Sequence, residues 1–246
     1  MSVAGRAPSA RGSSNEQDAA VTPAEVAVRT RPPRSTTVKA LRLEPVPASV
    51  VEPLVAREHY LHSMPAVTAG CFGVYLEGEL VGALVLSSGP RSAHRLLAAG
   101  RPGDVLTLAR LWLADFLPKN SESRVIAVVL RTLRRQGRAK LVLSYADPAA
   151  GHTGTIYRAA GFRSLGQTEA ASYIVLPDGR AHHPRSVYDR FGSNGVGHLR
   201  ATGVPARRVS VPGKHRYAYL LDPSWAWRLK PPASRARPIP SGEEHR

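Results

Sequence analysis

At 246 residues and 43% hydrophobic content, the chain is long and apolar enough to bury the core of one ordinary domain. Its 34 Lys and Arg residues against 18 Asp and Glu residues give a net charge of +16, which favours a polyanionic partner such as nucleic acid. A solvated surface rich in arginine is the alternative. The single cysteine, Cys71, excludes an intramolecular disulfide framework and fits a reducing compartment. No apolar run approaches the length of a membrane span, so we expect a soluble cytoplasmic protein without a membrane partner.

The two ends of the chain differ in composition from its middle. Residues 1–36 and 230–246 are rich in Ala, Ser, Arg, Pro and Gly and show no sustained periodicity. Segments of this kind bury too little apolar surface to offset the chain entropy lost on folding. We therefore expect a disordered basic leader, a single domain over residues 37–229, and a disordered tail.

The first part of the expected domain alternates strand and helix patterns. Residues 38–46 predict an opening strand, and residues 47–65 place apolar side chains at helical spacing before a proline. This helix brings His59 and Tyr60 to its C-terminal end. Residues 70–89 contain two β-rich runs around a short turn with glycine, which predicts a hairpin.

The stretch from Leu106 to Phe162 predicts a βαβα unit, around which the rest of the chain is organised. A strand over 104–114 leads through a loop to a helix with Ser121 as its N-cap, followed by an apolar strand over 140–148 and a short helix over 155–161. Short β-like runs then alternate with polar segments. The sequence therefore predicts an α/β domain with a mixed α+β sheet, and a V-shaped opening where the loops after the two strands converge.

The loop before the longer helix is a candidate phosphate site. Unpaired N–H groups and the helix dipole both favour an anion at a helix N-terminus. The loop supplies the candidate cofactor-binding residues Lys119, Asn120, Ser121 and Arg124. A plain N-cap explains the same residues equally well.

Two segments resemble the Gcn5-related N-acetyltransferase (GNAT) superfamily: GELVGALVL, like its central hairpin, and TIYRAAGF, like its tyrosine-containing helix. The resemblance implies a GNAT-like fold with coenzyme A at the loop before the helix. It also implies that Tyr157 is a general acid toward the leaving thiolate, where ordinary helix packing is the alternative. Residues 117–123 depart from the superfamily because they contain no glycine.

A narrower resemblance is to the phage Mom family, a divergent GNAT branch. It rests on HYLHSMP, LTLARLWLADFLPKNSESR, LSYADPAAGHTGTIYRAAGF and KHRYAY, and covers most of residues 43–221. It implies an enzyme of the host cytoplasm that adds a carbamoylmethyl-type group to the N6 amine of adenine in phage DNA and so protects it from restriction. It points to iron as a cofactor, and to acetyl-CoA or another acyl or glycyl-type donor.

The chemistry of adenine suggests which side chains are needed. The exocyclic amine is a weak nucleophile, so a base or polariser must lie near it and the nucleotide must usually be flipped from the duplex. Asp147, at the end of a strand, is the candidate, although an Asp before Pro also commonly starts a turn. His59 with Asp147 is a candidate iron pair, beside Tyr60; a capping histidine is the alternative. Further candidates are Ser123, Arg110 and His152.

Two basic clusters are candidate DNA contacts. The first is a row of arginines on the long helix, for which a solvated helix face is the favoured explanation: Arg131, Arg134, Arg135 and Arg138. The second is interleaved with aromatic residues that can stack on a base: Arg207, Arg208, Lys214, His215, Arg216, Tyr217 and Tyr219. The expected partner is double-stranded DNA with the adenine flipped out, and the protein is a candidate homodimer.

Three hypotheses follow from the sequence. The first is a DNA adenine-modifying transferase, the second a conventional acyl-CoA-dependent N-acetyltransferase of a small-molecule or peptide amine. The third is a basic DNA-binding protein without enzymatic activity on a GNAT scaffold. The product formed on DNA distinguishes them.

Overall fold

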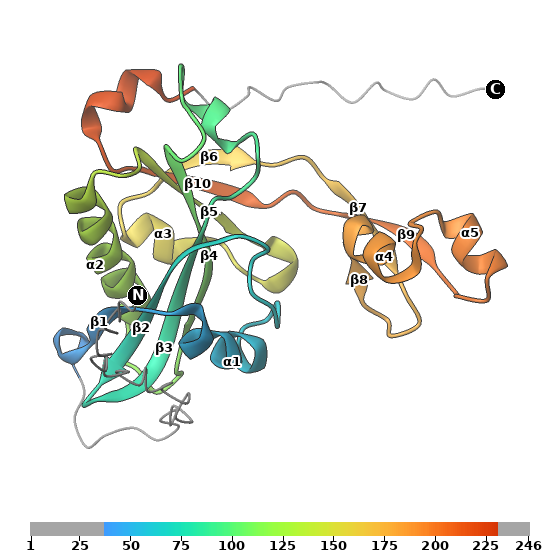
Figure 1. Cartoon of the computed structure of the whole chain (residues 1–246), viewed down its shortest axis with the longest axis horizontal. Helices are drawn as coiled ribbons and strands as arrows, with labels where there is room; N and C mark the ends of the chain where they lie inside the picture. The colour runs from blue at the N-terminus through green and yellow to red at the C-terminus, as the bar shows by residue number, and fades with distance from the viewer. Residues whose placement is uncertain (1–36, 231–246) are drawn as a thin grey trace, which may run out of the picture.

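A seven-stranded mixed sheet forms the body of the protein in the computed structural model, which describes residues 37–230 (Figure 1). The predicted leader, and the predicted tail beyond Lys230, lie outside the described residues. The strand order is β1-β2-β3-β4-β5-β10-β6. Neighbouring strands are antiparallel except β4 and β5, which are parallel. The strands span Arg42–Val46 (β1), Thr68–Leu76 (β2), Glu79–Ser87 (β3), Val105–Leu113 (β4), Leu141–Ala146 (β5), Arg163–Gln167 (β6) and His215–Leu220 (β10). The predicted α/β class with a mixed sheet is confirmed.

Helices cover both faces of the sheet because its central strands are apolar on both sides. On β3, Leu84 and Leu86 pack in the cluster that contains the apolar stripe of α2 (Ser121–Gln136) and Tyr157 of α3 (Thr155–Ala159). Ala83 and Val85 pack in the cluster of α1 (Ala48–Glu58) instead. This second cluster also contains Cys71, which is buried as its apolar surroundings predict.

Two local predictions, at the start of β1 and at the N-cap of α2, need correction. The strand predicted over 38–46 begins at Arg42, because Val38–Ala40 forms a 3-10 turn. Ser121 is not the N-cap of α2: its hydroxyl donates to the Pro118 carbonyl at 2.6 Å, and Asn120 is the N-cap, with a φ of 71°. Gly137 ends α2 in the left-handed conformation, with a φ of 65°, as expected for a helix C-terminus.

A small lobe is inserted between β6 and β10. It consists of a second sheet, in the order β8-β7-β9, and two helices: β7 (Ala171–Val175), β8 (Ala181–His182), α4 (Pro184–Phe191), α5 (Val196–Ala201) and β9 (Arg207–Val211). It has its own apolar core, centred on Ile174, Val187 and Leu199. In Figure 1 it projects from the body, joined by the chain segments after β6 and before β10. We call residues 171–211 the inserted lobe; the sequence analysis did not distinguish it within residues 37–229.

The remaining elements are short. The 3-10 turns at Ala93–Leu96, Pro148–Ala150 and Pro223–Arg228 lie in the connections between strands and after β10. None of the helices between residues 37 and 230 has the length and apolar character that crossing a bilayer requires.

Candidate active site

A cavity of about 500 Å³ opens where β4 and β5 separate. The two parallel strands pair only from Val105–Leu141 to Leu108–Ser144. The register between β3 and β4 shifts after Leu108, so that Ala109 bulges out and β4 turns away from β5. The walls come from residues 108–109 and 111–113 of β4, residues 145–146 of β5, the end of α1, the turn 151–154 and α3. The V-shaped opening expected between the two strands is therefore present.

His59 lines this cavity as a neutral hydrogen-bond donor. It is the C-cap of α1, and only 6% of the residue is exposed. Its Nδ1 accepts a hydrogen bond from the Leu61 N–H at 3.1 Å, which leaves the ring proton on Nε2. Burial, and secondarily the positive charge of Arg110, lowers the pKa of His59 from 6.5 to about 4. His59 therefore suits donation from Nε2 better than proton abstraction at neutral pH.

The lowered pKa of His59 predicts a pH-dependent stability. Between pH about 4 and 6.5 the folded chain binds fewer protons at this residue than the unfolded chain, so stability falls as the pH falls through that window. We expect a loss of about 1 to 2 kcal/mol, after allowance for screening by solvent. Urea unfolding at pH 7 and pH 4.5 measures it.

His59→Asn is the matched variant, because the Asn side-chain oxygen can still accept the Leu61 N–H while the titrating ring is gone. Its free energy of unfolding should depend less on pH by the same amount. An equal pH dependence in both proteins would contradict the assignment.

Tyr60 lies beside His59 at the mouth of the cavity. Its ring contacts the His59 ring with centroids 4.6 Å apart and meets the His152 ring edge-on at 5.0 Å, while 42% of the residue stays exposed. Burial of the phenol raises the pKa of Tyr60 despite the nearby ammonium of Lys214. Tyr60 is therefore a protonated, accessible aromatic ring at neutral pH, available for stacking.

Arg110 fixes the segment that carries these two rings. Its Nε donates to the Ser63 carbonyl at 2.7 Å and a terminal nitrogen donates to the Ala109 carbonyl at 2.8 Å. The guanidinium thus joins the bulge of β4 to the loop after α1. Arg110 is not among the described residues that line the cavity, and its role at the site stays a prediction.

Tyr157 projects from α3 and lines the inner part of the cavity. The residue is 8% exposed, and its ring contacts those of Phe162 and Tyr217 with centroids 5.6 and 5.5 Å away. Burial raises the pKa of Tyr157, and a hydrogen bond with the Ser144 hydroxyl opposes this shift only in part. The phenol keeps its proton at neutral pH, as a proton donor must.

Asp147 is engaged in two local interactions. One carboxylate oxygen accepts the Ala149 N–H at 3.0 Å and so caps the turn Pro148–Ala150, and the other lies 2.8 Å from the Lys214 ammonium. The Asp147 side chain is 13% exposed. Burial alone would lower the pKa of Lys214, but the hydrogen bond and charge of Asp147 outweigh it and raise that pKa. The turn-forming alternative for Asp147 is confirmed, and Lys214, predicted as a DNA contact, pairs with it.

The donor set does not fit the predicted iron pair of His59 and Asp147. His59 uses Nδ1 to accept a backbone N–H, both oxygens of Asp147 are engaged, and Tyr60 retains its proton. Within residues 37–230 no group of three or more His, Cys, Asp or Glu side chains is arranged to hold a metal ion. His59 and Asp147 are therefore not arranged as a pair of iron ligands.

The predicted phosphate loop closes largely on itself. Ser121 is 1% exposed and bonded to Pro118, and the Ser123 hydroxyl donates to the Asn120 carbonyl at 3.1 Å. Glu122, which the sequence analysis passed over, lines the cavity from the first turn of α2. Its carboxylate complements the dipole at the N-terminus of α2. Cofactor binding by Lys119, Asn120, Ser121 and Arg124 stays a prediction.

The second basic cluster divides between two parts of the molecule. Arg207 and Arg208 are exposed on β9 of the inserted lobe. Lys214 and the start of β10 belong to the body, where His215 contacts Gln167 and Arg216 donates to the Leu165 carbonyl.

The predicted stacking role of Tyr217 needs correction. The residue is 3% exposed, and its hydroxyl donates to the Thr153 carbonyl at 2.8 Å. A ring enclosed in this way packs against the turn 151–154 and cannot stack on a base. Tyr219 is half-buried and accepts a hydrogen bond from Arg134 at 2.9 Å, so it too has a local partner.

Other cavity-lining residues escaped the sequence analysis. Trp112 on β4 and Tyr145 on β5 line the cavity together with Thr153. The two aromatic residues lie on strands, where only the point of strand divergence decides whether a side chain enters the cavity or packs in the core. No local motif marks that point.

Comparison with known proteins identifies the family. The model of the Mom protein family matches residues 40–241. The chain belongs to the Mom protein family. A curated relative, the methylcarbamoylase Mom of Escherichia phage Mu, is 29% identical over 207 residues, which cover 82% of this chain and 84% of that protein. The family match over residues 40–241 thus includes the body, the inserted lobe and the cavity of this Mom-family protein.

Solved structures similar to this Mom-family chain include acetyltransferases. The ribosomal-protein-S5-alanine acetyltransferase of Vibrio fischeri is 11% identical, with a TM-score of 0.45 over 76% of this chain and 95% of that one. A GNAT family acetyltransferase of Elizabethkingia anophelis with acetyl-CoA bound is also 11% identical, with a TM-score of 0.43 over 74% and 98%. These likenesses are too distant to inform the activity.

Proposed function

We propose that this Mom-family protein transfers a carbamoylmethyl-type group to the N6 amine of adenine in DNA. In this proposal it acts on phage DNA in the cytoplasm of the host cell and protects that DNA from restriction. The observation that carries the proposal is the relationship to the methylcarbamoylase Mom of phage Mu over more than four fifths of both chains. The lining of the cavity between β4 and β5 supports it.

The cavity has the properties of a pocket for a flipped base. Its volume of about 500 Å³ exceeds that of one purine, and Tyr60, Trp112, Tyr145 and Tyr157 supply aromatic surface around it. Enzymes that modify bases stack the extruded base on aromatic side chains and read its edge by hydrogen bonds. In the proposed complex the exposed ring of Tyr60 stacks on adenine at the mouth of the cavity.

The reaction forms one bond to the transferred group, breaks the bond between that group and its donor, and includes two proton transfers. The N6 nitrogen bonds to carbon of the transferred group and loses a proton, while the donor's leaving group departs and takes one up. Tyr157, buried and protonated, is the proposed proton donor to the leaving group. His59 Nε2–H is proposed to donate a hydrogen bond to an oxygen of the transferred group or to a ring nitrogen of adenine. Because Asp147 is held by Lys214, we assign proton acceptance from the amine to His152, which lines the cavity.

The test is the product on DNA. The chain is expressed with a plasmid, the DNA is digested to nucleosides, and the nucleosides are separated and weighed by mass spectrometry. We expect a deoxyadenosine heavier by one carbamoylmethyl group, absent from cells with an empty vector.

Unmodified plasmid adenine, with well-folded protein in the cells, would contradict the proposal. Acetylation of small-molecule or peptide amines by the purified protein with acetyl-CoA would then favour the conventional acetyltransferase. Salt-sensitive DNA binding with no product of either kind would favour a non-enzymatic DNA-binding protein.

A further inference from the structure

The base of the inserted lobe joins the body next to the candidate active site. Its two connecting segments are held together at the body by Thr168 and Lys214, which exchange hydrogen bonds of 2.9 Å in both directions. Lys214 also pairs with Asp147, whose turn leads into the cavity wall. The Tyr173 phenol on β7 is among the smaller causes that raise the pKa of Tyr60 and of Lys214. The lobe therefore starts at the edge of the candidate active site.

The surface charge of the lobe is strongly positive. Residues 171–211 contain six arginines and no lysine, against two aspartates and no glutamate. Both aspartates are engaged within the lobe: Asp178 contacts His182 at 2.8 Å and Asp189 contacts Arg185 at 2.9 Å. All the arginines are exposed: Arg180, Arg185, Arg190, Arg200, Arg207 and Arg208. An all-arginine set favours phosphate ligands, because the guanidinium fork matches two phosphate oxygens.

Local hydrogen bonds orient part of this set. Arg200 Nε donates to the Ala206 carbonyl at 2.8 Å, which uses one of the five N–H donors of its guanidinium. Arg208 donates to the Ser172 hydroxyl and the Asn194 carbonyl at 3.4 and 3.2 Å. Guanidinium groups positioned in advance lose less side-chain entropy on binding.

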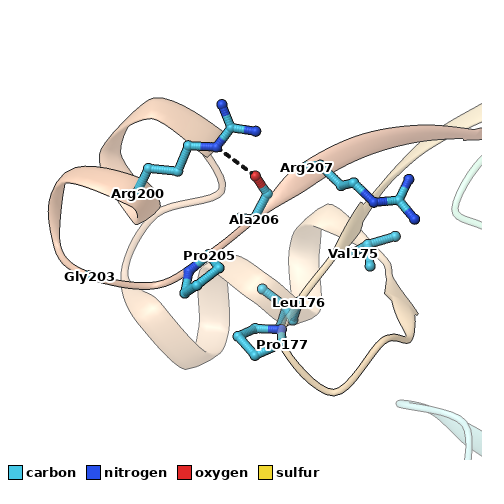
Figure 2. Close-up of a pocket in the computed structure, with 8 residues that line it drawn as sticks. All are labelled: Val175, Leu176, Pro177, Arg200, Gly203, Pro205, Ala206 and Arg207. Carbon is cyan, nitrogen blue, oxygen red and sulfur yellow. Dashed lines mark hydrogen bonds between the residues drawn. The ribbon is translucent and has the colours of Figure 1, made fainter.

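A shallow groove of about 580 Å³ lies between the C-terminal end of β7 and the segment from α5 to β9. Figure 2 shows Arg200 and Arg207 on either side of Ala206, with Leu176, Pro177 and Pro205 lower in the view. Such a surface offers apolar contact for deoxyribose and two guanidinium groups for neighbouring phosphates. Half or more of protein–DNA hydrogen bonds go to the sugar-phosphate backbone in this way.

We propose that the inserted lobe binds the phosphate backbone of duplex DNA beside the nucleotide that enters the cavity, with Arg200 and Arg207 as phosphate contacts. This inference rests on the proposed function, because it takes DNA to be the substrate. It assigns the lobe to holding the duplex, and the body to the chemistry. β6 and β10 are antiparallel neighbours that a short turn could connect; the lobe inserted between them adds this basic surface.

The test compares two double variants of the full chain that lose the same charge. Arg200→Gln/Arg207→Gln removes the groove arginines, and Arg42→Gln/Arg91→Gln removes two exposed arginines from β1 and the segment after β3. Binding to a fluorescent duplex is measured by anisotropy over a range of salt concentrations. Each lost phosphate contact lowers the slope of log K against log salt by about 0.9, so we expect a decrease of about 1.8 and an affinity roughly tenfold or more weaker for the groove variant alone.

Two further measurements separate the possible failures. Arg207→Gln, a single change at an exposed position, should lower the slope by about 0.9 and covers the case in which losing the Arg200–Ala206 hydrogen bond unfolds the lobe. Groove variants that bind with the wild-type slope, or an Arg42→Gln/Arg91→Gln variant that loses as much slope, would overturn the lobe's role while plasmid modification by the wild type still upholds the proposed function. A wild-type protein that neither binds nor modifies DNA would overturn both.

Discussion

Replacing Tyr157 by phenylalanine should abolish most of the modified deoxyadenosine. A positioned general acid contributes about a hundredfold to ten-thousandfold to a rate, so we expect product formation to fall by that factor. The ring itself should stay in place, since it packs against Phe162 and Tyr217 at centroid distances of 5.6 and 5.5 Å. The measurement is the rate of product formation on plasmid DNA, with the thermal unfolding midpoint measured on the same preparations.

Tyr219→Phe is the control for Tyr157→Phe. Tyr219 contacts Phe162 in the same aromatic cluster, and its hydroxyl also has one side-chain partner, Arg134, at 2.9 Å. It does not appear among the residues that line the cavity in the described part of the chain. We expect this variant to form product at close to the wild-type rate. If both variants lost activity together, or Tyr157→Phe kept it, the role of Tyr157 would be packing.

Much of the fold could be predicted from local patterns. The periodicity of α2, the continuous apolar run of β5 and the turn at Glu77–Gly78 each specify one local structure, and each is present. The inserted lobe could not be predicted in the same way. Its strands are short and half-exposed, and its core, around Ile174 and Leu199, comes from residues far apart in sequence. Such patterns do not indicate which strand pairs with which.

Only some residues of the candidate site could be predicted from the sequence. His59, Tyr60, His152 and Tyr157 all line the cavity, as expected from residue type and position after strands and helices. The protonation states and ion-pair partners of the site residues could not be predicted from the sequence, because they depend on burial and on side chains from distant segments. Lys214 is 67 positions from Asp147, and nothing in the sequence distinguishes it from the other basic residues near Arg216. Only the return of the chain from the lobe brings its ammonium to the carboxylate.

Removing the Lys214 ammonium should destabilise the protein. Lys214→Met would leave the carboxylate of Asp147, 13% exposed, without its cation. Loss of one partner of a buried pair costs about 3 to 5 kcal/mol, and the 31% exposure of the Lys214 side chain reduces the expected cost to about 1 to 3 kcal/mol. Urea unfolding measures this loss.

The double variant Asp147→Asn/Lys214→Met shows whether the pair is the cause. An asparagine can still accept the Ala149 N–H that Asp147 accepts, and no buried charge then lacks a partner, so we expect part of the stability to return. The coupling energy from the wild type, the two single variants and the double variant should be about 1 kcal/mol or more.

The same Lys214→Met protein also decides between the two roles of the lysine. If Lys214 contacts DNA directly, the slope of log K against log salt for DNA binding should fall by about 0.9 in this variant. If Lys214 only pairs with Asp147, that slope should not change. If the two substitutions changed the stability additively and Lys214→Met also lowered the slope, Lys214 would be a DNA contact. Asp147 would then be stabilised only by its hydrogen bond within the turn.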